Sequence, residues 1–224
     1  MLLGGKMDIH RVRENEKEYI EYEESYLHNT ALMAFEGEVS ISIFEYRVVS
    51  PYKAEVINFT IFNEADEADL YKGFIKELCY WNPYIREVVY EGQELKIKNY
   101  AEIFKISIDK IVPAQLTVNE EKLEKVLSWI DKPQDVIISC LKINDKVICI
   151  DGHTRLVAAY KKDFHYVYGY YEEIENKDFY ETCLKWCNDE GINSVENLLQ
   201  TVVTSKEHEE IWIDRCQQYF KEKQ

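Results

Sequence analysis

The sequence predicts an α+β protein made of two successive parts. In the first part, runs typical of strands surround one amphipathic helix in the order β-β-α-β, and in the second a β-hairpin leads into a strand–turn–helix. Of the 224 residues, 46% are hydrophobic and 13% aromatic, which is sufficient for a packed core. A polar stretch separates the parts, so we expect an N-terminal domain over residues 8–95 and a C-terminal domain over residues 103–224.

The first part is read from changes in hydrophobic period. Residues 8–33 mix charges with tyrosines near helical spacing, which predicts a helix. Residues 39–50 and 54–63 alternate between apolar and polar side chains, which predicts two paired strands. Residues 64–82 form an amphipathic pattern with an acidic first turn, typical of a helix, and 85–92 read as a further strand.

The second part begins with a short strand that ends near Pro113. Asn119 is a suitable N-cap for the helix that follows, whose buried stripe contains Leu123 and Val126. Asn144-Asp145 is a hairpin turn between two apolar strands. The predicted strands cover 135–143, 146–151 and 165–173, and the predicted helices cover 154–163, 176–189, 194–203 and 206–222.

Composition narrows the classes of partner. The net charge of −15 disfavours binding to nucleic acid or to an anionic membrane surface, since both depend on Lys and Arg. A small anionic ligand needs only a locally positive site. The six cysteines lack the spacing of a metal cluster, so we expect structural thiols and no metal site. No apolar run reaches the ~20 residues of a membrane helix, and the expected location is the cytoplasm.

One strand–turn–helix combines residues suited to holding an anion. The segment Asp151-Gly152-His153-Thr154-Arg155 joins an apolar strand to a helix through one glycine. Asp151 or Thr154 is expected to cap the helix, and its first amides would point at a ligand with the helix dipole behind them. Arg155 adds a planar cation suited to phosphate. An ordinary strand–helix junction remains an equal alternative on these grounds alone.

The surroundings of this turn resemble the ParB/sulfiredoxin-like fold. The shared pattern runs from Pro113 to Tyr160: a Pro-x-Gln strand end, a helix, a β-hairpin, and a glycine turn that ends in arginine. The five residues from Asp151 to Arg155 look most like the free-serine kinases of that group. The resemblance implies that Gly152, His153, Thr154 and Arg155 contact nucleotide phosphates. It also implies that Asp151 orients the hydroxyl substrate or a Mg²⁺ ion.

The sequence departs from that group at two positions. Sulfiredoxins carry a cysteine before the His-Arg pair of the turn, and Gly152 stands there instead, which excludes their chemistry. The kinases use a glutamate base at a position that corresponds to Gln115, whose amide cannot abstract a proton. Glu120 and Glu121 lie nearby and could substitute, although both also suit the first turn of a helix.

The first part is faintly similar to the centre of acetyltransferases of the GNAT class. Their coenzyme A site needs a basic loop with glycine, whose amides reach the pyrophosphate. Here the loop over residues 63–69 carries carboxylates and no glycine. The resemblance therefore implies a degenerate scaffold that has lost the cofactor site.

We expect a phosphate- or nucleotide-binding protein, with a specific hypothesis of phosphate transfer from ADP or ATP, with Mg²⁺, to a hydroxylated metabolite such as serine. The candidate catalytic residues are Asp151, His153 and Glu120. Two alternatives stay open: a non-catalytic nucleotide-sensing or protein-interaction module, and a degenerate acetyltransferase-like protein. The sequence does not indicate the oligomeric state.

Overall fold

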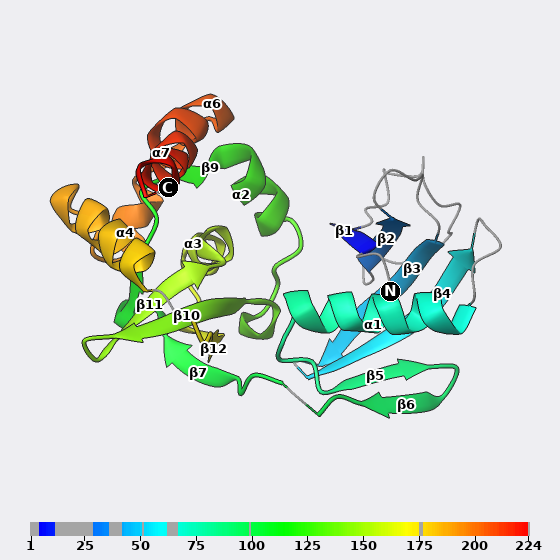
Figure 1. The fold of residues 1–224 in the computed structure, drawn as a ribbon. Helices are drawn as coiled ribbons and strands as arrows, with labels where there is room; N and C mark the ends of the chain where they lie inside the picture. Colours follow the sequence, from blue (N-terminus) through cyan, green and yellow to red (C-terminus); the bar gives the residue numbers. More distant parts are fainter. Residues whose placement is uncertain are drawn as a thin grey trace. The chain divides into compact units, whose positions relative to one another are not determined.

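A computed structural model describes residues 5–11, 29–35, 42–50, 52–61, 67–98, 100–174 and 177–223. It has the α+β class that the sequence predicts, with sheets and several helices (Figure 1). The chain divides into two compact units, Met1–Ala101 and Glu102–Gln224.

The first unit is built on a six-stranded sheet in which the strands follow their order along the chain. Neighbouring strands are antiparallel except β4 and β5, which run parallel because α1 connects them as a crossover. The predicted β-β-α-β succession is confirmed for β3, β4, α1 and β5. The elements are β1 (Gly5–Arg11), β2 (Asn29–Phe35), β3 (Ser42–Ser50), β4 (Lys53–Ile61), α1 (Glu67–Trp81), β5 (Glu87–Tyr90) and β6 (Gln93–Lys96).

The helix predicted over residues 8–33 is wrong wherever this range is described. Residues 8–11 belong to β1 and residues 29–33 belong to β2, and the two strands pair antiparallel with Met7 opposite Met33. Pairing within a sheet overrides weak local helical spacing. The tyrosines on which the helix prediction rested, Tyr19, Tyr22 and Tyr26, lie outside the described residues.

Helix α1 packs its apolar stripe against this sheet. Leu70, Phe74 and Leu78 recur at intervals of four and are all buried. The ring of Phe74 stacks on that of Phe44 of β3, with 4.3 Å between centroids and 4° between planes. This contact fixes α1 against β3, the strand next to the parallel pair.

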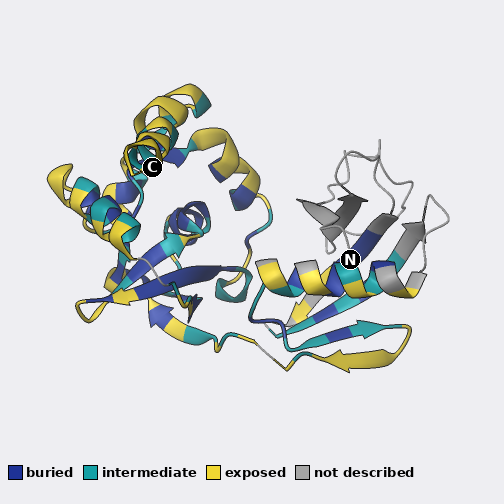
Figure 2. Ribbon diagram, in the orientation of Figure 1, coloured by how far each residue is buried: buried dark blue, intermediate teal, exposed yellow. Residues whose placement is uncertain are grey.

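The second unit contains a five-stranded sheet in the order β7-β12-β10-β11-β8. β10 is the central strand, and every residue in it except Lys142 is buried (Figure 2). Asn144 and Asp145 have φ values of 48° and 60°, as expected for the central residues of a two-residue hairpin turn between β10 and β11. The strands are β7 (Phe104–Ser107), β8 (Ile111–Pro113), β10 (Ile137–Ile143), β11 (Lys146–Asp151) and β12 (Tyr166–Tyr171).

Most of the helices of the second unit match the prediction. Asn119 caps α2, since its Oδ1 accepts from the Lys122 amide at 2.9 Å, and Ser194 caps α5 in the same way. A π-helical segment, Glu209–Ile213, joins α6 to α7. None of the described helices is long and apolar enough to cross a bilayer. The helices are α2 (Glu120–Leu127), α3 (His153–Lys161), α4 (Asp178–Asp189), α5 (Val195–Leu199), α6 (Ser205–His208) and α7 (Asp214–Glu222).

The helix predicted over residues 194–203 is too long. α5 ends at Leu199, and Val202–Val203 forms a short strand, β13, that pairs parallel with β9 (Val118–Asn119). The β-branched valines suit this strand. The Asn119 side chain also donates to the hydroxyl of Ser205 at 2.9 Å. The start of α6 is therefore tied to the segment that precedes α2.

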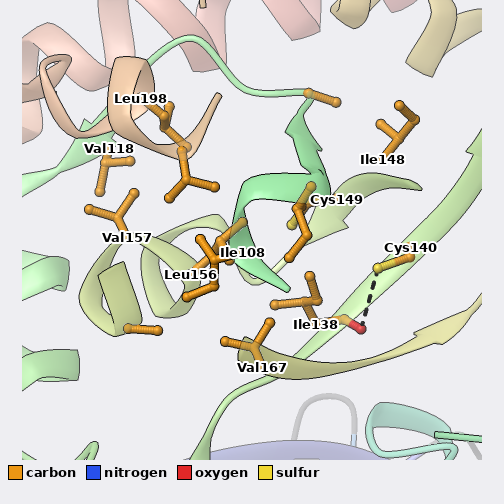
Figure 3. Close-up of a cluster of buried hydrophobic side chains, with 14 of the residues drawn as sticks. Ile108, Val118, Ile138, Cys140, Ile148, Cys149, Leu156, Val157, Val167 and Leu198 are labelled. Atoms are coloured by element: carbon orange, nitrogen blue, oxygen red, sulfur yellow. Dashed lines mark hydrogen bonds between the residues drawn. The ribbon is translucent and has the colours of Figure 1, made fainter. Parts of the chain in front are cut away.

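The core of the second unit lies between the sheet and α3. Leu156 of α3, Ile138 of β10 and Val167 of β12 are each fully buried in it (Figure 3). Cys140 and Cys149 belong to the same cluster, opposite each other on β10 and β11. Their burial agrees with the structural role predicted for these thiols.

Candidate functional site

The turn from β11 into α3 depends on the conformation of Gly152. β11 ends at Asp151, α3 begins at His153, and Gly152 between them has φ 91°, in the left-handed region. A Cβ at this position would lie 3.0 Å from Arg155 Nη2 and 3.0 Å from Ile138 Cγ2. Glycine is therefore required both by the backbone conformation and by the closeness of the buried Ile138 methyl group.

The expectation that Asp151 or Thr154 caps α3 is wrong. The N-cap residue is Gly152, which has no side chain to accept a hydrogen bond. Thr154 lies inside the first turn of the helix and is buried. The Asp151 carboxylate is engaged elsewhere, because Arg155 Nη2 donates to its Oδ2 at 2.8 Å. No side chain of the turn thus caps the first amides of α3.

Asp151 and Arg155 form an ion pair at the mouth of the turn. The side chain of Asp151 is 73% exposed and that of Arg155 is 30% exposed. Solvent screens such a pair, which is worth at most about 1 kcal/mol. A ligand phosphate could therefore replace Asp151 as the partner of the guanidinium, and little free energy would be lost with the ion pair.

His153 is a buried, neutral side chain that links the turn to the strand end at Ala114. The residue is buried, and its Nε2 accepts a hydrogen bond from the backbone amide of Ala114 at 3.0 Å. Burial lowers the pKa of the imidazole to about 4, against smaller opposing contributions from Asp151 and from a backbone hydrogen bond with Cys149. The ring holds the strand end at residue 114 against the turn, and it is uncharged at neutral pH.

The first turn of α2 brings a further cation to this region. Lys122 lies close enough to His153 and to His208 that, after burial, its charge helps to lower the pKa of each. Sequence reasoning missed Lys122, whose only signal is its place in the first turn of α2. The candidate base Glu120 is exposed at the start of the same helix. The Gln115 amide donates to the carbonyl of Thr117 at 2.7 Å.

A second group of polar side chains lies on the sheet beside Asp151. Ser139 of β10 is in register with Asp151 on one side and with Tyr170 of β12 on the other. The Tyr170 hydroxyl donates to Glu172 Oε1 at 3.3 Å. Tyr180 of α4 is near enough that, after burial, the charges of Glu172 and Asp151 raise the pKa of its phenol. No sequence motif marked this group.

The thiols are poor ligands and poor nucleophiles. Cys183 and Cys187 are buried on α4, and burial raises the pKa of both, that of Cys187 to about 12. Within the described ranges, His, Cys, Asp and Glu side chains form no group of three that could hold a metal ion.

Comparison with known proteins leaves the family open. No protein-family model matches the chain, and no curated protein matches it. A crystal structure of protein Atu1540 from Agrobacterium tumefaciens is similar at 18% identity and a TM-score of 0.33. The alignment covers 43% of this chain and 61% of that one, so the chain spans about three fifths of that protein's length. A likeness this low identifies neither fold nor function.

Proposed function

We propose that the turn from Asp151 to Arg155 binds the phosphates of a nucleotide. The observation that carries this proposal is the start of α3, where a left-handed glycine is the N-cap and no side chain caps the helix. Free amides at a helix N-terminus attract anions through their N–H groups and the helix dipole. Arg155 lies across the glycine and adds a cation able to make two parallel hydrogen bonds to phosphate.

The ligand contacts differ in part from those expected from resemblance. Gly152 and Thr154 contribute through the backbone at the helix start, and Arg155 contributes its guanidinium. Lys122 is a further candidate, because it lies near His153. We assign His153 a positioning role, since its Nε2 is engaged by the amide of Ala114. Breaking that bond would free the strand end and loosen the turn.

Phosphate transfer to a hydroxylated metabolite such as serine is the leading specific hypothesis for catalysis. Asp151, the exposed acid of the turn, would orient the acceptor hydroxyl and could offer one oxygen to a Mg²⁺ ion. Mg²⁺ bound with ADP or ATP commonly takes one or two carboxylates together with phosphate oxygens, so one exposed carboxylate fits it. When bound, the ion would neutralise phosphate charge. Glu120 is the candidate base on α2.

A non-catalytic nucleotide sensor is the second candidate. It is favoured by Gln115, which stands where the resembling kinases carry their base and whose amide is bonded to the Thr117 carbonyl. A sensor needs the phosphate turn and no base. The two candidates therefore make the same prediction for nucleotide binding and opposite predictions for turnover.

The finer fold assignments are part of the same proposal. The order β8, α2, hairpin and α3 around the glycine turn supports a ParB/sulfiredoxin-like second unit with C-terminal helices. The parallel β4–α1–β5 crossover supports a degenerate acetyltransferase-like first unit. Residues 62–66, most of the loop on which that degeneracy rests, lie outside the described residues. We propose a cytoplasmic protein with no nucleic-acid or membrane partner.

The test is thermal unfolding of the full chain with ATP, ADP, CTP or coenzyme A, each with and without Mg²⁺. A ligand at 100 times its Kd stabilises the folded state by about 2.7 kcal/mol, which gives a clear rise in Tm. We expect that rise with a nucleotide and its loss in Arg155→Ala. Arg47→Ala, which removes an exposed arginine of the first unit paired with Glu55, is the matched control.

Two measurements would decide whether the turn binds nucleotide and whether the protein transfers phosphate. No rise in Tm with any nucleotide, or an equal rise in Arg155→Ala and wild type, would refute the phosphate site. Where nucleotide binds, ³¹P NMR with serine and ADP or ATP separates the two candidates. Phosphoserine that forms with wild type and not with Glu120→Gln supports the kinase, and binding without product supports the sensor.

A further inference from the structure

The Asp151 carboxylate occupies the cation that the proposed phosphate site needs. Arg155 Nη2 donates to Asp151 Oδ2 at 2.8 Å. An aspartate beside an arginine can hold the guanidinium in place for a ligand, or it can fill the position that the anion of the ligand would take. The first role predicts weaker anion binding when the carboxylate is neutralised, and the second predicts tighter binding. The geometry of this pair favours the second role.

The hydrogen bond uses a nitrogen that a phosphate also needs. A guanidinium offers two forks of parallel N–H groups, Nε with Nη2 and Nη1 with Nη2, so Nη2 belongs to both. The Nε–Nη2 edge of Arg155 lies beside Gly152, since a Cβ there would be 3.1 Å from Nε and 3.0 Å from Nη2. The carboxylate of Asp151 therefore either blocks this fork or stands close to a phosphate bound by it, and like charges at close range repel.

The exposure of the two side chains shows which of them can move. The side chain of Asp151 is 73% exposed, so its carboxylate can turn into water with little loss of packing. The side chain of Arg155 is only 30% exposed and belongs to the first turn of α3. Asp151 is therefore the partner that leaves when an anion reaches the guanidinium.

We propose that Asp151 is an internal competitor of phosphate, which occupies Arg155 in the ligand-free chain and turns away when phosphate binds. This inference rests on the proposed phosphate site and adds an inhibitory contact to it. Phosphate displaces the carboxylate because it also reaches the first amides of α3, which no side chain of the turn caps. An exposed ion pair is worth at most about 1 kcal/mol, which corresponds to about fivefold in affinity.

The test is titration of the full chain with inorganic pyrophosphate, in EDTA and at low ionic strength. Two-dimensional ¹H–¹⁵N NMR follows the backbone amides of Gly152 and Thr154. Asp151→Asn keeps the size of the side chain and removes its charge, and we expect this variant to bind pyrophosphate up to about fivefold more tightly than wild type. An affinity equal to or lower than that of wild type would overturn the proposal, because a carboxylate that only positions Arg155 weakens binding when it is lost.

A double variant separates competition for Arg155 from a general effect of charge. Asp151→Asn/Arg155→Ala is expected to bind no better than Arg155→Ala, because the group for which Asp151 competes is gone. A gain that persists without the guanidinium would overturn the proposal. Asp145→Asn is the matched control, since Asp145 is an exposed aspartate paired with Lys142 at 3.2 Å, at the hairpin end of β11. It removes the same charge and is expected to bind pyrophosphate as wild type does.

Failure of this inference is distinguishable from failure of the phosphate site. If pyrophosphate shifts the two amides in wild type and Asp151→Asn shows no gain, the competitor is refuted and the phosphate site stands. If pyrophosphate shifts them in neither protein, the phosphate site is refuted and the competitor with it. Binding that is detected only in Asp151→Asn would support both.

Discussion

Replacing Gly152 with alanine tests the geometry on which the phosphate turn depends. At φ 91° an alanine is strained by about 1–2 kcal/mol relative to glycine. Its Cβ would also lie 3.0 Å from Ile138 Cγ2 and from Arg155 Nη2. The guanidinium can swing outward, but Ile138 is fully buried in the central strand and has little room to move. Overpacking of this kind costs about 1–3 kcal/mol.

Gly191→Ala is the matched control for the cost of placing alanine at a positive φ. Gly191 also has a positive φ, 74°, and nothing lies within 4 Å of the position of its added Cβ. Its alanine variant therefore has the backbone strain without the collision. We expect Gly152→Ala to lower the free energy of unfolding by about 1–3 kcal/mol more than Gly191→Ala does. Loss of the exposed Asp151–Arg155 pair contributes only a small part.

The assay is urea unfolding followed by tryptophan fluorescence, because three of the four tryptophans lie in the second unit. Each variant is compared with wild type at neutral pH, and its nucleotide-induced Tm shift is recorded in parallel. Equal destabilisation by the two alanine substitutions would show that the guanidinium and Ile138 do not crowd Gly152. Crowding by Ile138 would then not be the reason why the turn needs glycine.

Three further predictions concern stability and reactivity. Burial lowers the pKa of His153 to about 4, so the unfolded chain binds more protons than the folded chain at acid pH. We therefore expect the free energy of unfolding, measured by urea titration, to fall by about 2 kcal/mol from pH 7 to pH 5. The fall should be clearly smaller in His153→Gln. Asn119→Ala removes the cap of α2 and a bond to α6, and should cost more than the ~1 kcal/mol expected for the simple cap change Ser194→Ala. In the folded protein a thiol reagent should modify only Cys79 and Cys216, slowly, because burial raises the pKa of each to about 11, whereas urea should expose all six thiols.

Local signals predicted much of the fold where they act over a few residues. The cap of α2 at Asn119, the hairpin turn at Asn144 and the glycine turn at Gly152 each follow from the conformational preferences of the residue itself. The helix expected across residues 8–33 failed because the two ends of that range pair with each other as strands. The long helix after Ser194 failed because Val202–Val203 pairs with β9, far away along the chain. Nothing in residues 202–203 indicates that Val118 will be beside them.

The sequence predicted which residues form the candidate site, but it did not predict their contacts with the rest of the chain. The motif identifies Gly152 and Arg155, but the capping assignment failed because the Asp151 carboxylate has a stronger partner in Arg155. The neutral state of His153 depends on the Ala114 amide, which comes from another strand.

The pairing of β9 with β13 has a consequence for the order of folding. It joins the residues just before α2 to the segment just before α6, which are far apart along the chain. Contacts between distant segments form late, because a long loop must first close. During synthesis from the N-terminus, α2 therefore lacks its bond to Ser205 until the last helices emerge. A chain that stops before residue 202 would have no partner for β9, because Val118 and Asn119 pair with Val202 and Val203.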